Sequence, residues 1–382
     1  MANSLRMQVL GQRPRRPGGP PRLSRTIIAV TEKLLEHEEV PMGIVGGLDI
    51  HRRQVTFDYL DTVTGEVRRG KIAPADREHV RSWLGRFAGR GDVAFALEGC
   101  TGWRFVAEEL EAVGARAHLA EPADTAHERG SKQRAKTDRS DARLLRELLA
   151  VGRLPESWIP PDHVLEVRGR VRLYKALSDE RRGWMQRIRA TLFHQGVPAL
   201  ACHLLDADGQ GHLQMAELSP AGRESIEVAL RQIERLEAEL AQLRAGLVAF
   251  AHHQMGCRAL QGHYGIGALL SVAIWEEMGD CRRFGSSSDA VRHAGLDVTV
   301  WASDSVRAPG HLARQGPAVL RWALYEAGQA AAKQTSPDHD YYLRVRERLG
   351  PERAALSVGR KLGRRCFHTL RDLGEQALAP AT

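Results

Sequence analysis

The sequence predicts an α/β domain followed by two largely helical parts, and three observations support this order. Residues 43–121 contain short apolar runs of strand length, which alternate with amphipathic segments of helix length. Residues 164–250 carry long arginine-rich and heptad-patterned stretches, which are typical of extended helices. From residue 255 onward the periodicity is again helical. We therefore expect a mixed-sheet domain, a helical middle with a coiled coil, and a mainly α C-terminal domain.

Composition indicates a multidomain protein with a basic surface. The chain has 382 residues, of which 43% are hydrophobic and 27% charged, with a net charge of +8 and a pI near 9.5. This excess predicts a polyanionic partner, nucleic acid before membrane. The sequence has no apolar run of membrane-spanning length and no recognisable signal peptide, so we expect a bacterial-type cytosolic location without membrane association. The five cysteines form no CxxC pair, which indicates reduced thiols.

Changes in composition divide the chain into four predicted parts. Residues 1–40 predict a disordered basic arm and linker, because the first 26 residues hold six arginines and no acid. This arm either adds phosphate contacts or has no role. Residues 41–155 form the predicted α/β domain, which a proline-rich stretch ends. Residues 160–250 are the predicted helical and coiled-coil domain, and residues 255–376 the C-terminal domain.

The α/β domain is predicted to start with three strands in an antiparallel meander. They are followed by a helix, a buried strand, a second helix and a fifth strand. The predicted bounds are, in order, 43–49, 55–61, 67–72, 73–89, 92–99, 101–113 and 115–121. Mixed sheets of this kind hold their ligands at the carboxyl ends of the strands.

Four acids fall where such a ligand site is expected. Asp49 ends the first strand and Glu98 ends the fourth. Asp138 and Asp141 lie on one face of the next helix, behind Thr137 as the predicted N-cap. Together the four carboxylates predict a site for Mg²⁺ or Mn²⁺. The alternative is ordinary: loop-facing acids at the strand ends and a helix start that complements the helix dipole.

Basic residues surround these acids in the sequence and are predicted to contact the phosphate backbone. A solvated charged surface is the alternative. The candidates of this group are Arg52, Arg53, Lys132, Arg134, Lys136 and Arg139, with His51 beside the first two.

Two long helices are predicted in the middle of the chain, at 164–195 and 219–250, with a loop between them. The second carries heptads, with isoleucine or leucine at the a positions and alanine or leucine at the d positions. The heptad positions are Ile226, Ile233, Leu240 and Leu247 at a, and Ala229, Leu236 and Leu243 at d. This pattern predicts a coiled coil with the preceding helix or between subunits. A single amphipathic helix on a core is the alternative.

The C-terminal part carries two further candidate sites. Gly265 and Gly267 form a turn between two helices, a helix-hairpin-helix-like segment that suits either a phosphate or close packing. Ser303 lies in a predicted irregular polar loop, close in sequence to Arg307 and Arg314, and is a candidate nucleophile. Most loop serines only stabilise turns. Helices are predicted at 316–333, 338–348 and 351–376 to close the chain.

The combination of these segments resembles a known family. The segments are LDIHRRQV, ALEGCTGW, AKTDRSDARLL, a GIG…GD.RRF block, and AGLDVTVWASDSVRAPGHLARQGPAVLRWAL. In this order, over residues 43–375, they are similar to the DEDD-type insertion-sequence transposases, the bridge-RNA-guided serine recombinases of bacterial mobile elements.

The resemblance implies a RuvC-like, ribonuclease-H-type N-terminal domain with Asp49, Glu98, Asp138 and Asp141 as its acidic tetrad. It also implies a C-terminal transposase domain whose catalytic serine falls on Ser303. Family members usually show Ser-Gly or Ser-Asp-Gly at this point. Here the sequence reads Ser-Asp-Ser, and the second serine, Ser305, is a less favoured candidate.

The function implied is RNA-guided DNA strand cleavage and exchange, with Mg²⁺ at the tetrad and a phosphoserine intermediate. The implied partners are DNA, a structured non-coding guide RNA, and further copies of the chain in a dimer or tetramer, at the nucleoid. Two alternatives stay open. One is a metal-dependent RuvC-like nuclease or Holliday-junction resolvase that uses water as nucleophile, and the other is a non-catalytic nucleic-acid-binding scaffold.

Overall fold

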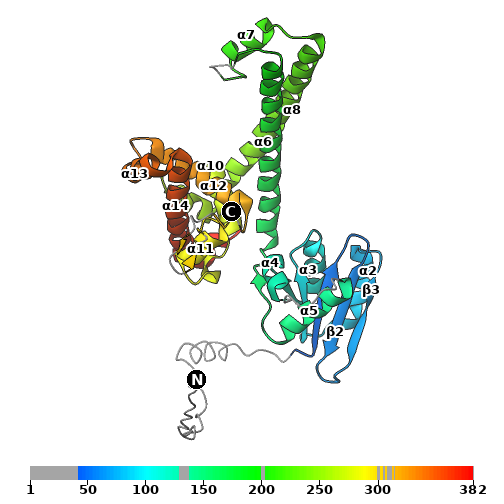
Figure 1. Cartoon of the computed structure of the whole chain (residues 1–382). Coiled ribbons are helices and arrows are strands. Elements are labelled where there is room, and N and C mark those ends of the chain that lie inside the picture. Colours follow the sequence, from blue (N-terminus) through cyan, green and yellow to red (C-terminus); the bar gives the residue numbers. More distant parts are fainter. Residues whose placement is uncertain are drawn as a thin grey trace, which may run out of the picture. The chain divides into compact units, whose positions relative to one another are not determined.

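The computed structural model describes residues 42–128, 137–198, 203–298 and 315–381, together with 302–303, 306–307 and 312–313 (Figure 1). The chain divides into two compact units, Met1–Ile159 and Pro160–Thr382. The predicted basic arm at 1–40 lies outside the described residues. In the described part, no helix is both long enough and apolar enough to cross a bilayer.

The first unit is built on a six-stranded sheet with the order β3-β2-β1-β4-β5-β6. The neighbours β1 (Ile44–Ile50), β4 (Val93–Glu98) and β5 (Arg116–Ala120) are parallel. β2 (Val55–Asp61) and β3 (Val67–Ile72) extend the sheet antiparallel on one side. The short β6 (Glu156–Ser157), which the sequence did not indicate, pairs antiparallel with β5. The predicted meander and mixed sheet are confirmed, and the architecture is consistent with a ribonuclease-H-type fold.

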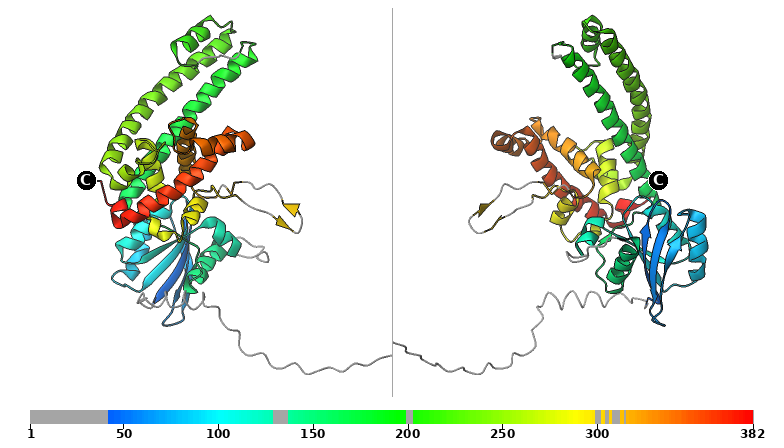
Figure 2. Two further views of the ribbon diagram at one scale, coloured as in Figure 1. Left: turned by 90° about the vertical axis from the view of Figure 1, so that its left-hand side faces the viewer. Right: turned by 45° about the vertical axis from the view of Figure 1, so that its right-hand side comes forward.

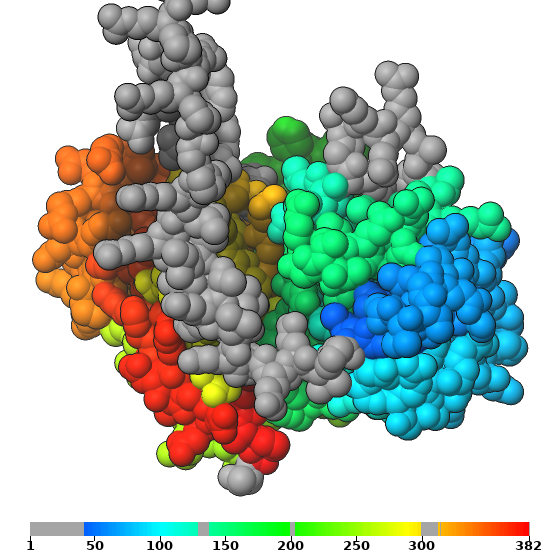
Figure 3. Space-filling model, turned by 90° about the horizontal axis from the view of Figure 1, so that it is seen from below, coloured from blue at the N-terminus to red at the C-terminus, as the bar shows by residue number. Residues whose placement is uncertain are grey.

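Helices cover both faces of this sheet. On one face α2 (Arg77–Leu84) and α3 (Trp103–Ala112) bury an apolar core that includes Phe95 and Leu97 of β4. On the other face α5 (Asp138–Ala150) packs Leu145 and Leu149 against Val45, Ala94 and Ala96. In Figure 3 the green surface of α5 lies directly against the blue surface of the first strands. Side chains alternate along a strand, so Val45 and Gly47 of β1 share the α5 face with their paired residues Ala94 and Ala96 of β4.

Two adjacent glycines let the central strand β1 be approached closely from both faces. A Cβ on Gly46 would come within 2.1 Å of the Phe95 ring. A Cβ on Gly47 would come within 2.0 Å of the Ala142 carbonyl oxygen of α5. Glycine in a central strand marks this kind of close approach. The backbone of α5 therefore rests directly on β1.

The first predicted helix, 73–89, is shorter in the structure. Asp76 caps α2 and accepts a hydrogen bond from the His79 backbone N–H, so the helix begins at Arg77. After Leu84 the chain tightens into a 3₁₀ turn, η1 (Gly85–Phe87). Trp83 and Phe87 are buried. A further short helix, α4 (Pro122–Glu128), was not predicted.

Two long helices, α6 (Asp162–His194) and α8 (Pro220–His253), pack along one another in the second unit (Figures 1 and 2). Ile188 and Leu192 of α6 share a core with Ile226, Ala229 and Ile233 of α8. These heptad residues therefore face the preceding helix. The predicted loop between the two helices is in part wrong, because it contains α7 (Ala207–Met215), capped by Asp206.

Further helices make up most of the rest of the described second unit, which is mainly α as expected. They are α9 (Met255–Leu260), α10 (Ala268–Met278), η2 (Cys281–Arg283), α11 (Ser287–His293), α12 (Ala318–Gln329), η3 (Ala330–Ala332), α13 (His339–Leu349), α14 (Pro351–Leu373) and η4 (Gly374–Leu378). α14 packs on α11, α12 and α13. The predicted irregular loop around Ser303 instead contains a short antiparallel pair, β7 (Ala302–Ser303) and β8 (Val306–Arg307), drawn as two small arrows in Figure 2.

A buried charge network anchors α6 to α10. Arg168 donates to the Glu276 carboxylate at 2.7 Å and to the Glu276 carbonyl oxygen at 2.6 Å.

A second arginine, Arg283 of η2, lies beside His293 of α11. Arg283 donates to the Glu277 carbonyl oxygen at 3.2 Å and lies 3.2 Å from His293 Nε2. The pKa of His293 is lowered to about 4, chiefly by burial and next by the positive charge of Arg283. His293 is therefore neutral near pH 7, and its Nε2 accepts the Arg283 N–H.

Candidate metal centre

The centre lies at the carboxyl end of β1, where α5 begins on the same face of the sheet. Asp49 is the sixth residue of β1 and points to the α5 face, since Val45 and Gly47 do so. Asp138 is the first residue of α5. Thr137 caps α5 and forms a capping box with Ser140, as the Thr-x-x-Ser spacing permits. The cap fixes where α5 starts, and so places Asp138 opposite Asp49.

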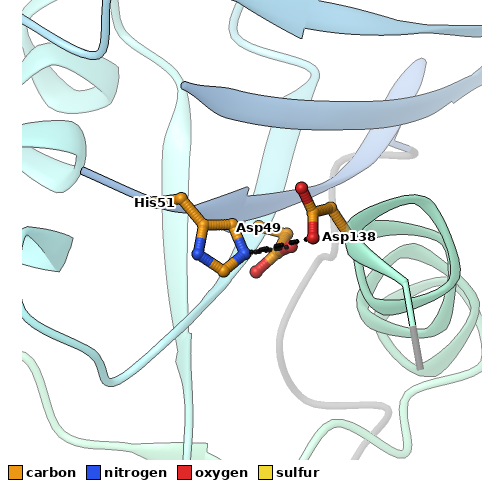
Figure 4. A group of neighbouring side chains, drawn as sticks. All are labelled: Asp49, His51 and Asp138. Carbon is orange, nitrogen blue, oxygen red and sulfur yellow. Dashed lines mark hydrogen bonds and ion pairs between the residues drawn. The ribbon is translucent and has the colours of Figure 1, made fainter. Parts of the chain in front are cut away.

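His51 joins the two acids (Figure 4). Its Nε2 atom lies 3.0 Å from Asp49 Oδ2 and 3.4 Å from Asp138 Oδ1. One ligand atom from each of the three residues lies within 4.8 Å of the others. Two acids separated by 89 positions in the sequence are thus brought together by one imidazole.

Polar contacts hold Asp138 from the opposite side. Gln54 Nε2 donates to Asp138 Oδ2 at 2.9 Å, and Lys71 Nζ donates to Gln54 Oε1 at 3.1 Å. His51 and Gln54 close one turn, since the His51 N–H donates to the Gln54 carbonyl oxygen at 2.9 Å. The β1–β2 turn therefore supplies the contacts to both acids, and the amide of Gln54 orients Asp138.

Burial and like charge both act on Asp49, whose side chain is 9% exposed. Its pKa is raised to about 6, chiefly because burial disfavours the charged form. His51 lowers this pKa, while Asp141 and Asp138 raise it. A buried carboxylate beside two others is a group that a cation would stabilise.

The remaining two acids of the predicted tetrad are close by but outside this group of three among the described residues. Asp141 lies one turn along α5 from Asp138 and near enough to raise the pKa of Asp49. Glu98 ends β4, one position beyond the paired residues Leu48 and Leu97, so it shares the face of Asp49. Glu98 and Asp49 also both raise the pKa of Cys100, after burial.

The donor set fits a divalent cation. Ligands at right angles on an octahedral ion with bonds of about 2.1 Å are separated by about 3 Å. The distances from His51 Nε2 to the two carboxylates, 3.0 and 3.4 Å, are of this size. Carboxylates are ordinary ligands of Mg²⁺ and Mn²⁺, and imidazole is an ordinary ligand of divalent ions of the first transition row.

The predicted nucleic-acid contacts are only partly described. Arg52 and Arg53 lie exposed in the turn after β1, and Arg139 is exposed on the first turn of α5. All three are available to a phosphate backbone beside the candidate centre. The residues Lys132, Arg134, Lys136 and Arg314, and the side chain of Arg307, lie outside the described part of the chain.

The candidate residues of the second unit are placed as follows. Gly265 adopts φ +89°, and a Cβ there would meet the Ala327 carbonyl oxygen at 2.4 Å, so it serves close packing on α12. Gly267 precedes α10, is exposed, and has open space where a Cβ would lie. Ser303 lies on β7, paired with Val306 of β8. The side chain of Ser303 and the whole of Ser305 are outside the described residues.

Sequence reasoning missed three residues of this centre and its support. It treated His51 only as a flank of a phosphate contact, and it did not consider Gln54. The signal for His51 was available: it follows Asp49 by two positions, so both point to the same side of an extended chain. It also missed Arg146 of α5, whose Nη1 lies 2.9 Å from the buried Asp58 carboxylate of β2.

Comparisons with known proteins match two segments of the chain. A family model for DEDD transposases of IS110 elements, described as "Transposase", matches residues 46–194. A second model, described as "Transposase IS116/IS110/IS902 family", matches residues 257–343. A relative from Sinorhizobium fredii (strain NBRC 101917 / NGR234), named "Putative transposase y4rJ", is 31% identical over 243 residues. The match covers 57% of this chain and 60% of that relative's length.

The two family models cover the sheet with its first long helix and then the helices around the β7–β8 hairpin, in the order that the resemblance implies. All the acids of the candidate centre fall within the first of these matches. Over these two segments the chain is therefore similar to transposases of the IS110 family.

Proposed function

We propose that this protein is a transposase that cuts and rejoins DNA strands, with a divalent cation held by Asp49 and Asp138. The observation that carries the proposal is the convergence of these two carboxylates on His51 at the carboxyl end of β1. The match to a transposase family model and the exposed arginines beside the centre support DNA as the substrate. DNA as the substrate would place the protein at the nucleoid.

Each acid has a defined part in this proposal. Asp49 and Asp138 bind the ion, and Asp141 and Glu98 complete the tetrad from the same face of the sheet. Gln54 orients Asp138 and keeps its second oxygen occupied. When bound, Mg²⁺ or Mn²⁺ would neutralise charge on the scissile phosphate and favour departure of an oxygen.

Ser303 is the proposed nucleophile. Its Oγ attacks the phosphorus, a phosphoserine bond forms, and the bond from phosphorus to the 3′ oxygen breaks. The serine proton passes to a base, and the leaving 3′ oxygen takes up a proton. Attack by another 3′ hydroxyl on the phosphoserine reverses the step, so strands are exchanged without an external energy source. Support comes from the resemblance of residues 294–324 to the family's serine segment.

A structured guide RNA and further copies of the chain are proposed as partners. Base pairing between RNA and DNA would set the target, while the protein would contact backbone and shape. Two cleavages in one exchange require at least a dimer, and a tetramer is equally compatible. Sequencing the RNA that copurifies with the protein tests this part, and a preparation free of any defined RNA would contradict it.

The serine assignment is tested with purified protein, DNA carrying the element's ends, the copurified RNA, and Mg²⁺. We expect wild type to give a protein–DNA adduct that survives detergent. Ser303→Ala should abolish the adduct and retain RNA binding, whereas the matched control Ser305→Ala should form the adduct normally. Asp138→Asn should abolish strand cleavage altogether. Adducts from Ser303→Ala at the wild-type level would refute the assignment.

A second candidate, a metal-dependent nuclease or Holliday-junction resolvase, has one observation in its favour. All four acids and His51 lie in the first unit, so an ion site needs no residue of the second. Water would then attack the phosphorus, and cleavage would be hydrolytic. Nicked products without an adduct, unchanged in Ser303→Ala and lost in Asp138→Asn, would favour this candidate. If the protein binds nucleic acid but cleaves no strand, the result would favour the remaining alternative, a non-catalytic nucleic-acid-binding scaffold.

A further inference from the structure

His51 occupies a position that the acidic tetrad alone does not explain. Its Nε2 atom faces two carboxylates at once, at 3.0 Å from Asp49 and 3.4 Å from Asp138. An imidazole nitrogen carries either one hydrogen or one lone pair. A hydrogen can point well at only one of two acceptors, and a lone pair facing two carboxylates is repelled unless a cation lies between them.

We propose that His51 is a nitrogen ligand of the divalent ion, and that it makes the centre prefer Mn²⁺ over Mg²⁺. This inference rests on the proposed function for the presence of an ion at Asp49 and Asp138. It adds a third ligand outside the tetrad and a preference that four carboxylates would not give.

The fold presents His51 for this role. The residue follows Asp49 by two positions, and the turn that it closes with Gln54 keeps its ring above the carboxylate. Figure 4 shows the ring pointing from the end of β1 toward Asp138 at the start of α5. Asp49 is 9% exposed, whereas the His51 side chain is 53% exposed. The imidazole thus closes the solvent side of a site whose floor is a buried carboxylate.

The ligand chemistry gives the preference. Mg²⁺ strongly favours oxygen ligands and retains its water molecules. Divalent ions of the first transition row accept imidazole readily, and Mn²⁺ accepts both carboxylate and imidazole. Replacing one oxygen position by nitrogen therefore favours Mn²⁺ relative to Mg²⁺. Glutamine at position 51 would offer an amide oxygen from a side chain of similar reach, and so would remove the preference while leaving an oxygen ligand.

The experiment measures ion binding by the full-length protein without nucleic acid. Free Mn²⁺ is followed by its electron paramagnetic resonance signal, Mg²⁺ is added as competitor, and pulsed measurements detect ¹⁴N coupled to the bound ion. We expect directly coordinated nitrogen in wild type. In His51→Gln the nitrogen coupling should vanish, and Mn²⁺ affinity should fall about tenfold relative to Mg²⁺ affinity.

A matched control uses a histidine–aspartate pair elsewhere in the same unit. His79 Nδ1 lies 2.8 Å from Asp76 Oδ1 on the surface, and neither residue belongs to the candidate centre. His79→Gln should leave Mn²⁺ affinity and the ¹⁴N coupling as in wild type. Circular dichroism of each variant checks that the fold is kept, and the wild-type ¹⁴N measurement needs no variant at all.

The outcomes separate this inference from the proposed function. Mn²⁺ binding that is lost in Asp138→Asn but shows no ¹⁴N coupling in wild type would overturn the role of His51 and leave the acid site standing. The same holds if His51→Gln keeps the wild-type ratio of Mn²⁺ to Mg²⁺ affinity. Two results would overturn the ion site itself. One is wild type that binds neither ion, and the other is Asp138→Asn that binds both ions as tightly as wild type.

Discussion

Replacing Gly47 by alanine should push α5 off the sheet and open the candidate centre. The added Cβ would lie 2.0 Å from the Ala142 carbonyl oxygen, 2.7 Å from the Arg146 backbone nitrogen and 2.9 Å from Leu145 Cβ. Two of these three are backbone atoms of α5, which cannot rotate away. β1 is hydrogen-bonded on both sides, to β2 and β4, so the helix must yield rather than the strand.

The displacement follows from the distances. Ordinary contact begins near 3.4 Å, so the carbonyl oxygen must retreat by about 1.4 Å. Asp138 lies one turn before Ala142 on the same helix, and would move by a similar distance from Asp49. Overpacking of this kind costs about 2 kcal/mol. Ion sites tolerate shifts of only about 0.2 Å in ligand distances. We therefore expect Mn²⁺ affinity to fall at least about tenfold.

Hydrogen-exchange mass spectrometry on β1 and α5 peptides measures the stability effect locally, because the two units need not unfold together. Mn²⁺ titration measures the effect on the centre. The matched control is Gly85→Ala in the same unit, where φ is −52° and no atom lies within 4 Å of the added Cβ. Wild-type exchange and ion affinity in Gly47→Ala would show that close packing of α5 does not position the acids.

Two further substitutions test the buried charges. Arg146→Met leaves the carboxylate of Asp58, a residue that is 2% exposed, without one of its two arginine partners. Hydrogen exchange should then show that β2 and α5 lose about 3 kcal/mol of stability. A loss under about 1 kcal/mol would contradict the stabilising role of this ion pair. The pKa of His293 is about 4 in the folded chain against 6.5 unfolded, so the unfolded state takes up the proton first and stability falls as pH drops from 6.5 to 4. In His293→Gln, the glutamine side chain accepts the Arg283 N–H but does not titrate. Between pH 7 and pH 5, the free energy of unfolding of the second unit in urea should therefore fall by about 2 kcal/mol less in this variant than in wild type. Equal falls in the two proteins would refute this account.

Local patterns were sufficient for most elements. The alternation in residues 55–61 predicted β2 with its observed bounds, because a half-buried strand has a period of two in its own sequence. The bounds predicted for β3, 67–72, are also the observed ones. The helix bounds were less accurate where a cap decides them, as at Asp76. α7 was missed because ADGQGHLQM has little amphipathic pattern, and its helix depends on the Asp206 cap and on packing of Leu213.

The acids of the centre could be found from the sequence for the same reason. Asp49 and Glu98 stand at the ends of apolar runs, and Asp138 and Asp141 have helical spacing, so each is marked by its immediate neighbours. Their pairing could not be predicted. That Gln54 would reach Asp138, 84 positions away, depends on how the β1–β2 turn meets the start of α5.

By itself, the sequence determined that an α/β unit with acids at its strand ends precedes a helical unit, since strand and helix periods and caps are properties of neighbouring residues. Only the tertiary structure decided that Asp49 and Asp138 share one imidazole, and that Asp58 of β2 is paired with Arg146 of α5. These contacts depend on the order of the strands and on the face where α5 docks. Both are set by packing between residues far apart in the chain, with Gly47 as the point where helix and strand touch.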